Sequence, residues 1–227
     1  MRFLFGLAAI AATAAVAGCT TMPPPPAAIL TFAGASCAAT PDLSQALSLT
    51  PEKERALYSV TTQVGSATPC VHRDGRDSFY LVYAIPEDAG DKTLTVGGYL
   101  EPLRIFSPRV EVLDGHGETS RSFRPEEFMY RGPNYSVLFR PRSGERYVLV
   151  TTEDSRVGQK YDSIVIGVTT TSTGAVAGSA LAAGLVGGGT MYSGSDVGLS
   201  RTFSWEGAAQ VIVHDSDTKE EAAPAGH

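Results

Sequence analysis

From residue 56 onward, short hydrophobic segments alternate with turn residues, a pattern typical of β-strands. Residues 56–64 (ALYSVTTQV) and 92–100 (KTLTVGGYL) have the composition or alternation of half-buried strands. Residues 79–85 (FYLVYAI) and 146–152 (RYVLVTT) are hydrophobic at successive positions, which indicates strands buried on both faces. Further strands are predicted over residues 104–113, 119–123, 136–140, 162–171, 199–205 and 208–214. About nine short strands without intervening helices predict an all-β fold, an antiparallel β-sandwich of the jelly-roll-like type.

The segments between these strands have fewer sequence patterns that predict regular structure. Asp42 is expected to cap a short helix over residues 43–47, and residues 125–130 are expected to form one helical turn. Residues 65–78 are predicted to be a loop. Pro108 interrupts the strand at 104–113 and therefore predicts an edge or bulged strand there.

One segment does not fit the β pattern. Residues 163–195 contain no charged side chain, and residues 174–189 (GAVAGSALAAGLVGGG) are almost entirely Gly, Ala, Leu and Val. A spanning helix needs about 20 apolar residues, and glycine disfavours helices, so we do not expect this segment to cross a membrane. We expect a Gly/Ala-rich insertion at 174–195 that forms a surface loop. The GxxxG spacings leave open a membrane-touching or self-associating glycine zipper.

The N-terminus has the features of a bacterial lipoprotein signal peptide. Met1 and Arg2 precede an apolar run that ends in Val16-Ala17-Gly18-Cys19. Small residues before a cysteine predict cleavage after residue 18 and attachment of acyl chains such as palmitate to Cys19. The alternative is an ordinary secretory peptide cut near Ala17. Thr20, where enteric inner-membrane lipoproteins carry Asp, favours the outer membrane and a domain in the periplasm.

The mature chain is divided by composition. Residues 19–41 include four consecutive prolines and predict a stiff tether. Residues 42–214 are the predicted sandwich domain, and the charged residues 215–227 are predicted to be a disordered tail.

Two cysteines remain after Cys19. The cell envelope is oxidising, so Cys37 and Cys70 are expected to form a disulfide rather than two buried free thiols.

Charge and motifs exclude several functions. The net charge is −6 and no basic cluster exists in the sequence, which argues against nucleic acid as a partner. The sequence contains no G-x-S-x-G, dinucleotide-binding or P-loop motif, so we expect neither an enzyme nor a cofactor. Asp114, His116 and Glu118 alternate as metal ligands can, but the intervening glycines favour a hairpin turn and no metal. A paired-carboxylate hydrolase is a third alternative.

Aromatic residues near predicted turns offer stacking surfaces for a sugar. Trp205 is the only tryptophan and precedes a predicted turn at Glu206-Gly207. Tyr99, Tyr130 and Tyr135 also lie near predicted turns. Each could instead pack at the rim of the core, and for Trp205 an inward position that closes one end of the sandwich is the alternative.

Residues 42–171 carry a family resemblance. The pieces are YAIP with KTLTV at 83–96, IFSPRVEVLD at 105–114, FR with FMY at 123–130, and RYVLVTTE at 146–153. In order and spacing they resemble the maltose operon periplasmic protein family. The resemblance implies an envelope protein associated with maltodextrin uptake, and it transfers no catalytic residue.

These observations lead to two hypotheses. The first is a non-enzymatic lipoprotein with an accessory role in carbohydrate transport, which contacts a glycan or a component of a carbohydrate transporter. The alternative is a structural or assembly lipoprotein of the cell envelope with no sugar role, which uses the Gly/Ala segment for oligomeric or membrane contact.

Overall fold

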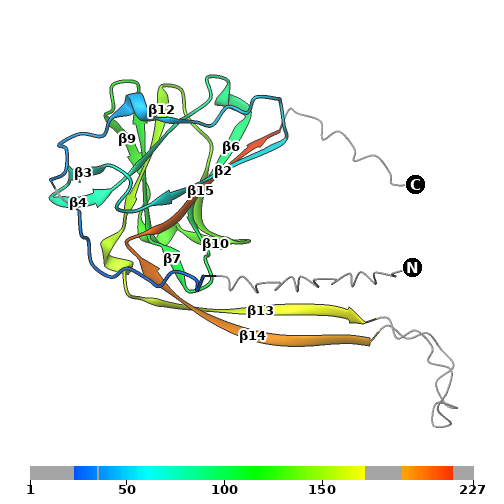
Figure 1. Cartoon of the computed structure of the whole chain (residues 1–227). Coiled ribbons are helices and arrows are strands. Elements are labelled where there is room, and N and C mark those ends of the chain that lie inside the picture. Colours follow the sequence, from blue (N-terminus) through cyan, green and yellow to red (C-terminus); the bar gives the residue numbers. More distant parts are fainter. Residues whose placement is uncertain (1–22, 35, 172–190, 217–227) are drawn as a thin grey trace, which may run out of the picture.

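The computed structural model describes residues 23–34, 36–171 and 191–216 (Figure 1). In these ranges the chain forms fifteen strands and four single-turn 3-10 helices, which confirms the all-β class. The short helices are η1 (Leu43–Gln45), η2 (Ala89–Asp91), η3 (Pro125–Glu127) and η4 (Asp154–Arg156). No helix in these ranges is long and apolar enough to cross a membrane.

Two five-stranded sheets form a sandwich. The first has the order β1 (Leu47–Ser48), β5 (Leu81–Ala84), β12 (Glu145–Thr152), β8 (Pro108–Asp114) and β9 (Thr119–Ser122). The second has the order β10 (Met129–Arg131), β11 (Asn134–Phe139), β6 (Lys92–Tyr99), β15 (Gly207–Asp215) and β2 (Leu57–Val64). The strand count exceeds the nine expected, and this order does not confirm the jelly-roll-like connectivity.

The core follows from the alternation along the strands. Val110 and Val150 of the first sheet and Val96 and Val211 of the second are fully buried in the main hydrophobic cluster. Successive residues of a strand point to opposite faces, so Leu149 of β12 lies on the outer face of the first sheet. It is buried there in a second, smaller cluster, which explains why β12 is hydrophobic on both faces.

A β-hairpin covers that outer face where we expected a loop. β3 (Cys70–Arg73) pairs with β4 (Arg76–Phe79). Asp74 and Gly75 form the connection with φ values of 52° and 76°. Two successive positive φ values are characteristic of a type I′ turn, whose twist matches that of the flanking strands. Asp-Gly is a strong sequence signal for this turn. The expectation of a loop over residues 65–78 holds for residues 65–69 and was wrong from Cys70 onward.

Pro108 separates two strands of different sheets. β7 (Arg104–Phe106) ends before it and belongs to a three-stranded sheet, whereas β8 begins at Pro108. The interruption in this segment is thus a change of sheet, and not a bulge in one edge strand.

The three-stranded sheet has the order β13 (Lys160–Thr171), β14 (Met191–Ser204) and β7. β13 and β14 form a long antiparallel ribbon that extends away from the sandwich (Figure 1). β14 begins at Met191, whereas the sequence predicted a strand only from residue 199. The Gly/Ala-rich residues 174–189, with both interpretations of them, lie outside the described residues, as do the signal peptide, Cys19 and residues 217–227.

Part of the predicted tether belongs to the domain. The Ile29 carbonyl accepts a hydrogen bond from the Trp205 amide at 2.9 Å, and the Ile29 amide donates to Ser204 Oγ at 2.8 Å. Ala38 bridges to Val71 of β3. The domain therefore begins before residue 42, at about Ile29.

The expected disulfide is present. Cys37 and Cys70 are bonded, with their Cα atoms 4.8 Å apart. The bond fixes the N-terminal segment to the first residue of β3 and so to the hairpin that covers the first sheet.

Candidate functional site

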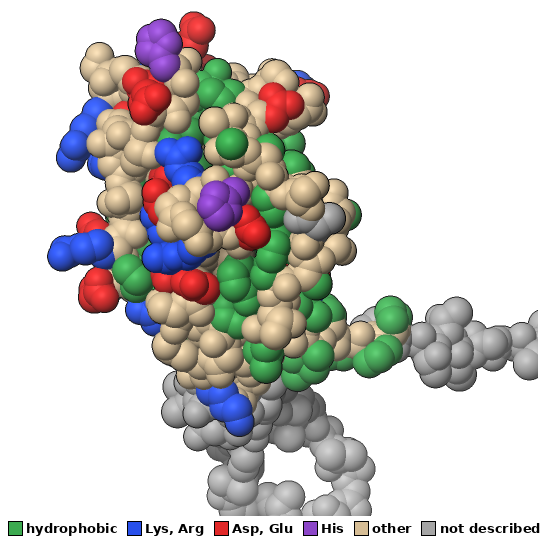
Figure 2. Space-filling model, turned by 90° about the vertical axis from the view of Figure 1, so that its left-hand side faces the viewer, with side chains coloured by type: hydrophobic (Ala, Val, Ile, Leu, Met, Phe, Trp, Pro, Cys, Tyr) green, Lys and Arg blue, Asp and Glu red, His purple; other side chains and the backbone are tan. Residues whose placement is uncertain are grey.

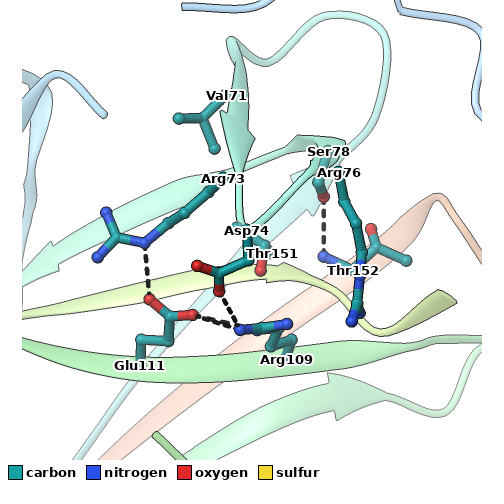
Figure 3. A pocket seen from close by; sticks show the side chains of 9 residues that line it. All are labelled: Val71, Arg73, Asp74, Arg76, Ser78, Arg109, Glu111, Thr151 and Thr152. Carbon is teal, nitrogen blue, oxygen red and sulfur yellow. Dashed lines mark hydrogen bonds and ion pairs between the residues drawn. The ribbon is translucent and has the colours of Figure 1, made fainter. Parts of the chain in front are cut away.

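A polar cleft lies between the β3–β4 hairpin and strand β8 (Figure 3). On the face that carries this hairpin, basic and acidic side chains gather beside a hydrophobic band (Figure 2). The cleft is lined by Val71, Arg73, Asp74, Arg76, Ser78, Arg109, Glu111, Thr151 and Thr152.

Local structure brings these charges together. Arg109 and Glu111 alternate with the core residue Val110, so both point out of the first sheet, toward the hairpin. Arg73 ends β3, and Asp74 occupies the turn that follows it. The hairpin thus places one arginine and one carboxylate over an arginine and a carboxylate of β8.

Glu111 is the centre of this cluster. The residue is only 3% exposed, and its carboxylate accepts hydrogen bonds from several directions. Arg73 Nε lies 2.9 Å from Oε2, Arg109 Nε lies 3.1 Å from Oε1, and Thr119 Oγ1 donates to Oε2 at 3.3 Å. A buried carboxylate is tolerated when it is paired and fully hydrogen-bonded in this way.

Arg109 links the cluster to the turn of the hairpin. Its Nη2 atom lies 2.5 Å from Asp74 Oδ2 and 3.1 Å from Glu111 Oε1 (Figure 3). One guanidinium therefore joins a carboxylate of β8 to a carboxylate of the hairpin turn.

The second strand of the hairpin, β4, is held separately. Arg76 Nη1 lies 3.1 Å from Asp154 Oδ1 in η4. The Thr152 amide of β12 donates to Ser78 Oγ at 2.9 Å. Both strands of the hairpin are thus attached to the first sheet or to the helical turn that follows it.

The space left between these groups is small. The cavity has a volume of about 20 Å³, which admits a water molecule but not a sugar ring. Its arginines and carboxylates are already paired with one another. The arrangement is a clamp that fastens the hairpin to β8, and none of its residues was predicted from the sequence to belong to a site. Charged residues at alternate positions of an otherwise hydrophobic strand, as at Arg109 and Glu111, are the pattern that could have indicated it.

A second hollow, of about 380 Å³, is bordered by acidic residues around a buried lysine. Lys92 Nζ lies 2.9 Å from Asp88, 3.0 Å from Asp215 and 3.5 Å from Asp91. Burial alone would lower the pKa of Lys92, but the hydrogen bonds to Asp88 and Asp215 outweigh it and raise the pKa. The ammonium group occupies the centre of the acidic cluster, where a cation would otherwise sit.

No group of three His, Cys, Asp or Glu side chains in the described ranges is placed to hold a metal ion. Asp114 Oδ1 accepts from the amides of His116 at 2.8 Å and Glu118 at 3.0 Å, which closes the expected hairpin turn. The hydrogen bond from the His116 amide lowers the pKa of the Asp114 carboxyl; desolvation opposes this shift, and the hydrogen bond from the Glu118 amide adds to it. The segment is thus a turn, as its glycines indicated.

Of the four aromatic candidates, the structure brings Tyr130 and Tyr135 into contact, with ring centroids 4.9 Å apart, whereas Trp205 packs on Phe32. Trp205 is half-buried, with its ring centroid 5.5 Å from that of Phe32 in the N-terminal segment. Phe32 packs in turn on Phe79, at 4.8 Å. The inward alternative for Trp205 thus describes its packing better than an open platform does.

The three tyrosines have different environments. Tyr135 is 3% exposed and packs edge-on against Phe203, so it offers no face to a sugar, and its selection as a stacking residue was wrong. Tyr130 is half-buried, with one face stacked on Tyr161 at 3.7 Å between centroids. Tyr99 is half-buried at the end of β6. Burial raises the pKa of both Tyr130 and Tyr135.

Comparison with family models, with curated proteins and with solved structures gives no match to this chain. The resemblance to the maltose operon periplasmic protein family therefore stays a prediction from the sequence.

Proposed function

We propose that this chain is a lipid-anchored protein of the bacterial cell envelope, facing the periplasm from the outer membrane, with a structural or assembly role. The observation that carries this proposal is the position of the N-terminal segment. Ile29 is hydrogen-bonded to Ser204, the last residue of β14, and to Trp205 beside it. The chain from the proposed lipid attachment site thus reaches the domain next to the base of the β13–β14 ribbon.

The length of this connection limits the distance between domain and membrane. Ten residues lead from Cys19 to Ile29, and an extended chain covers at most about 3.5 Å per residue, so the point where the chain joins the domain stays within about 35 Å of the lipid. The tether is shorter than the sequence suggested, because the residues after Ile29 lie on the domain. This short connection supports a protein that works at the membrane surface.

Two features favour an assembly role over a catalytic one. The buried charges of the polar cleft are paired with one another around a cavity of about 20 Å³. By contrast, the longest strands of the described part of the chain extend away from the sandwich, where they can meet another protein.

An accessory role in maltodextrin uptake is the second candidate. It is favoured by the sequence resemblance and by Tyr130, whose partly exposed ring is held in place by its stack on Tyr161. Stacking of a sugar on such a ring contributes about 1 kcal/mol, so weak binding is expected. Titration with maltoheptaose, with Tyr130→Ala as the comparison, tests this candidate: tyrosine fluorescence or chemical shifts should respond in the wild type alone.

Fractionation of cells that express the full chain tests the first proposal. Wild-type protein and the neighbouring control Thr20→Ser should be found in the outer-membrane fraction, because several acyl chains hold a protein firmly in a bilayer. Cys19→Ser should be released into the soluble fraction. Recovery of Cys19→Ser in the membrane fraction at the wild-type level would contradict the lipid anchor.

A further inference from the structure

The edges of the two sandwich sheets are mostly short. Three of the four edge strands, β1, β9 and β10, have two, four and three residues. The fourth, β2, has eight. Short edge strands expose few unpaired main-chain groups, which is one way in which β proteins avoid pairing with other chains.

The β13–β14 ribbon does not follow this rule. Its strands have twelve and fourteen residues and pair from Lys160 with Thr202 to Thr171 with Met191. Among the described residues, the only other strand that pairs with the ribbon is β7, which contacts residues 202–204 at the base of β14. Within the described ranges, β13 is therefore an edge strand along its whole length.

The sequence of the ribbon lacks the usual protection of an edge. Residues 163–195 contain neither a charged residue nor a proline, the two residue types that most often block pairing at edges. An isolated two-stranded ribbon is marginally stable in water, whereas further strands stabilise it. Pairing with a further strand would therefore stabilise the ribbon.

We infer that the edge of β13 pairs antiparallel with the β13 edge of a second copy of this chain, so that the two ribbons form one continuous four-stranded sheet. Pairing over residues 163–171 would add about nine main-chain hydrogen bonds. This inference gives the partner for the assembly role proposed above.

Three arguments favour a second copy over another partner. An edge that pairs antiparallel with itself makes a contact with twofold symmetry, the commonest arrangement in protein dimers. The edge carries no charges over residues 163–171, so identical edges meet without repulsion. A lipid anchor within about 35 Å of the domain also confines copies to one surface and raises their effective concentration, and this last argument rests on the proposed function.

Cysteine crosslinking in isolated membranes tests the pairing in the full chain. Single cysteines are placed at each position from 163 to 169, and Ser59→Cys on the exposed edge strand β2 is the control. Residues directly opposite in antiparallel strands have Cα atoms about 4.5–5.5 Å apart. Mild oxidation should therefore give disulfide-linked dimers at one or two adjacent positions, with less on either side and none for Ser59→Cys. If no position gives more crosslinked dimer than Ser59→Cys, the inference is overturned.

Proline substitution separates pairing between copies from the integrity of the ribbon. Amides of successive residues alternate between β14 and the free edge, so one of Val165→Pro and Ile166→Pro removes only a free-edge donor. In a crosslinking variant, that substitution should lower the dimer yield at least tenfold and leave the melting temperature unchanged. Crosslinking that survives both prolines would also overturn the inference.

The two proposals can fail independently in this experiment. Protein that sediments with the membrane without crosslinking leaves the lipid anchor intact and refutes the pairing. Crosslinked dimers in the soluble fraction would instead support the pairing and refute the anchor.

Discussion

Replacement of Glu111 by glutamine should destabilise the protein far more than replacement of an exposed glutamate. Glu111→Gln preserves the shape of the side chain but removes the charge that faces Arg73 and Arg109. The glutamine amide can accept from one arginine, but its own N–H groups then point at the donors of the other. The clamp between the hairpin and β8 would lose its central anion.

The magnitude follows from the burial of the three side chains. Loss of one partner from a buried ion pair costs about 3–5 kcal/mol. The Glu111 side chain is 4% exposed, whereas those of Arg73 and Arg109 are 24% and 23% exposed. Water can therefore solvate part of each arginine in the variant, and we expect the lower end of that range, about 3 kcal/mol. For a domain of this size, that corresponds to a fall in melting temperature of roughly 6–12 °C.

Urea unfolding of the mature chain, followed by the fluorescence of Trp205, measures this loss. Glu127→Gln is the matched control, because Glu127 pairs with Arg124 at 3.7 Å while both side chains are largely exposed. Glutamine can also replace glutamate in the capping of η3, so the control should lose at most about 0.5 kcal/mol. If the two variants have the same stability, the clamp contributes nothing beyond a surface ion pair and our reasoning is wrong.

Three further predictions concern the core and the disulfide. Trp205→Ala should lower the free energy of unfolding by about 2–3 kcal/mol, because the indole packs on Phe32; an unchanged melting temperature would indicate an exposed ring. Replacement of Cys37 and Cys70 by serine should cost about 3–4 kcal/mol in urea unfolding, since the bond closes a loop with a sequence separation of 33, and a loss below about 1 kcal/mol would contradict this. Burial, opposed by nearby Thr62, raises the pKa of Tyr83 from 10.0 to about 12. The stabilising effect of the neutral Tyr83 phenol is therefore present below pH 10 and is lost as the pH rises toward 12. Across that interval the wild type should lose up to about 3 kcal/mol more than Tyr83→Phe, and parallel pH profiles of the two proteins would refute this.

The fold could be predicted where burial follows a simple period. Residues 146–152 are hydrophobic on both faces, and β12 is buried on both because the β3–β4 hairpin and η1 cover its outer side. The hairpin itself was missed because its strands are short and polar, although Asp74-Gly75 carried the turn signal. The first half of β14 was missed because glycine and serine are poor strand formers, and its pairing with β13 was not visible in the sequence.

The polar clamp could not be predicted from the sequence. Arg73 and Glu111 are 38 positions apart, and only the turn of the hairpin brings one over the other. The orientation of Trp205 was open for a similar reason, because the N-terminal segment that covers it was expected to be a tether. Local sequence patterns thus predicted strands and the disulfide, whereas contacts between distant segments could be identified only in the folded structure.

The most direct test of the account is the mass of the solubilised protein with and without the ribbon. Asp162 and Ser200 are paired in the ribbon, so replacement of residues 163–199 by Asn-Gly joins them through a two-residue hairpin turn and preserves the base of β13 and β14. Light scattering in mild detergent should give a dimer for the wild type and a monomer of unchanged melting temperature for the shortened chain. A shortened chain that is still dimeric, or a wild type that is monomeric at membrane-like concentrations, would contradict an assembly role for the ribbon.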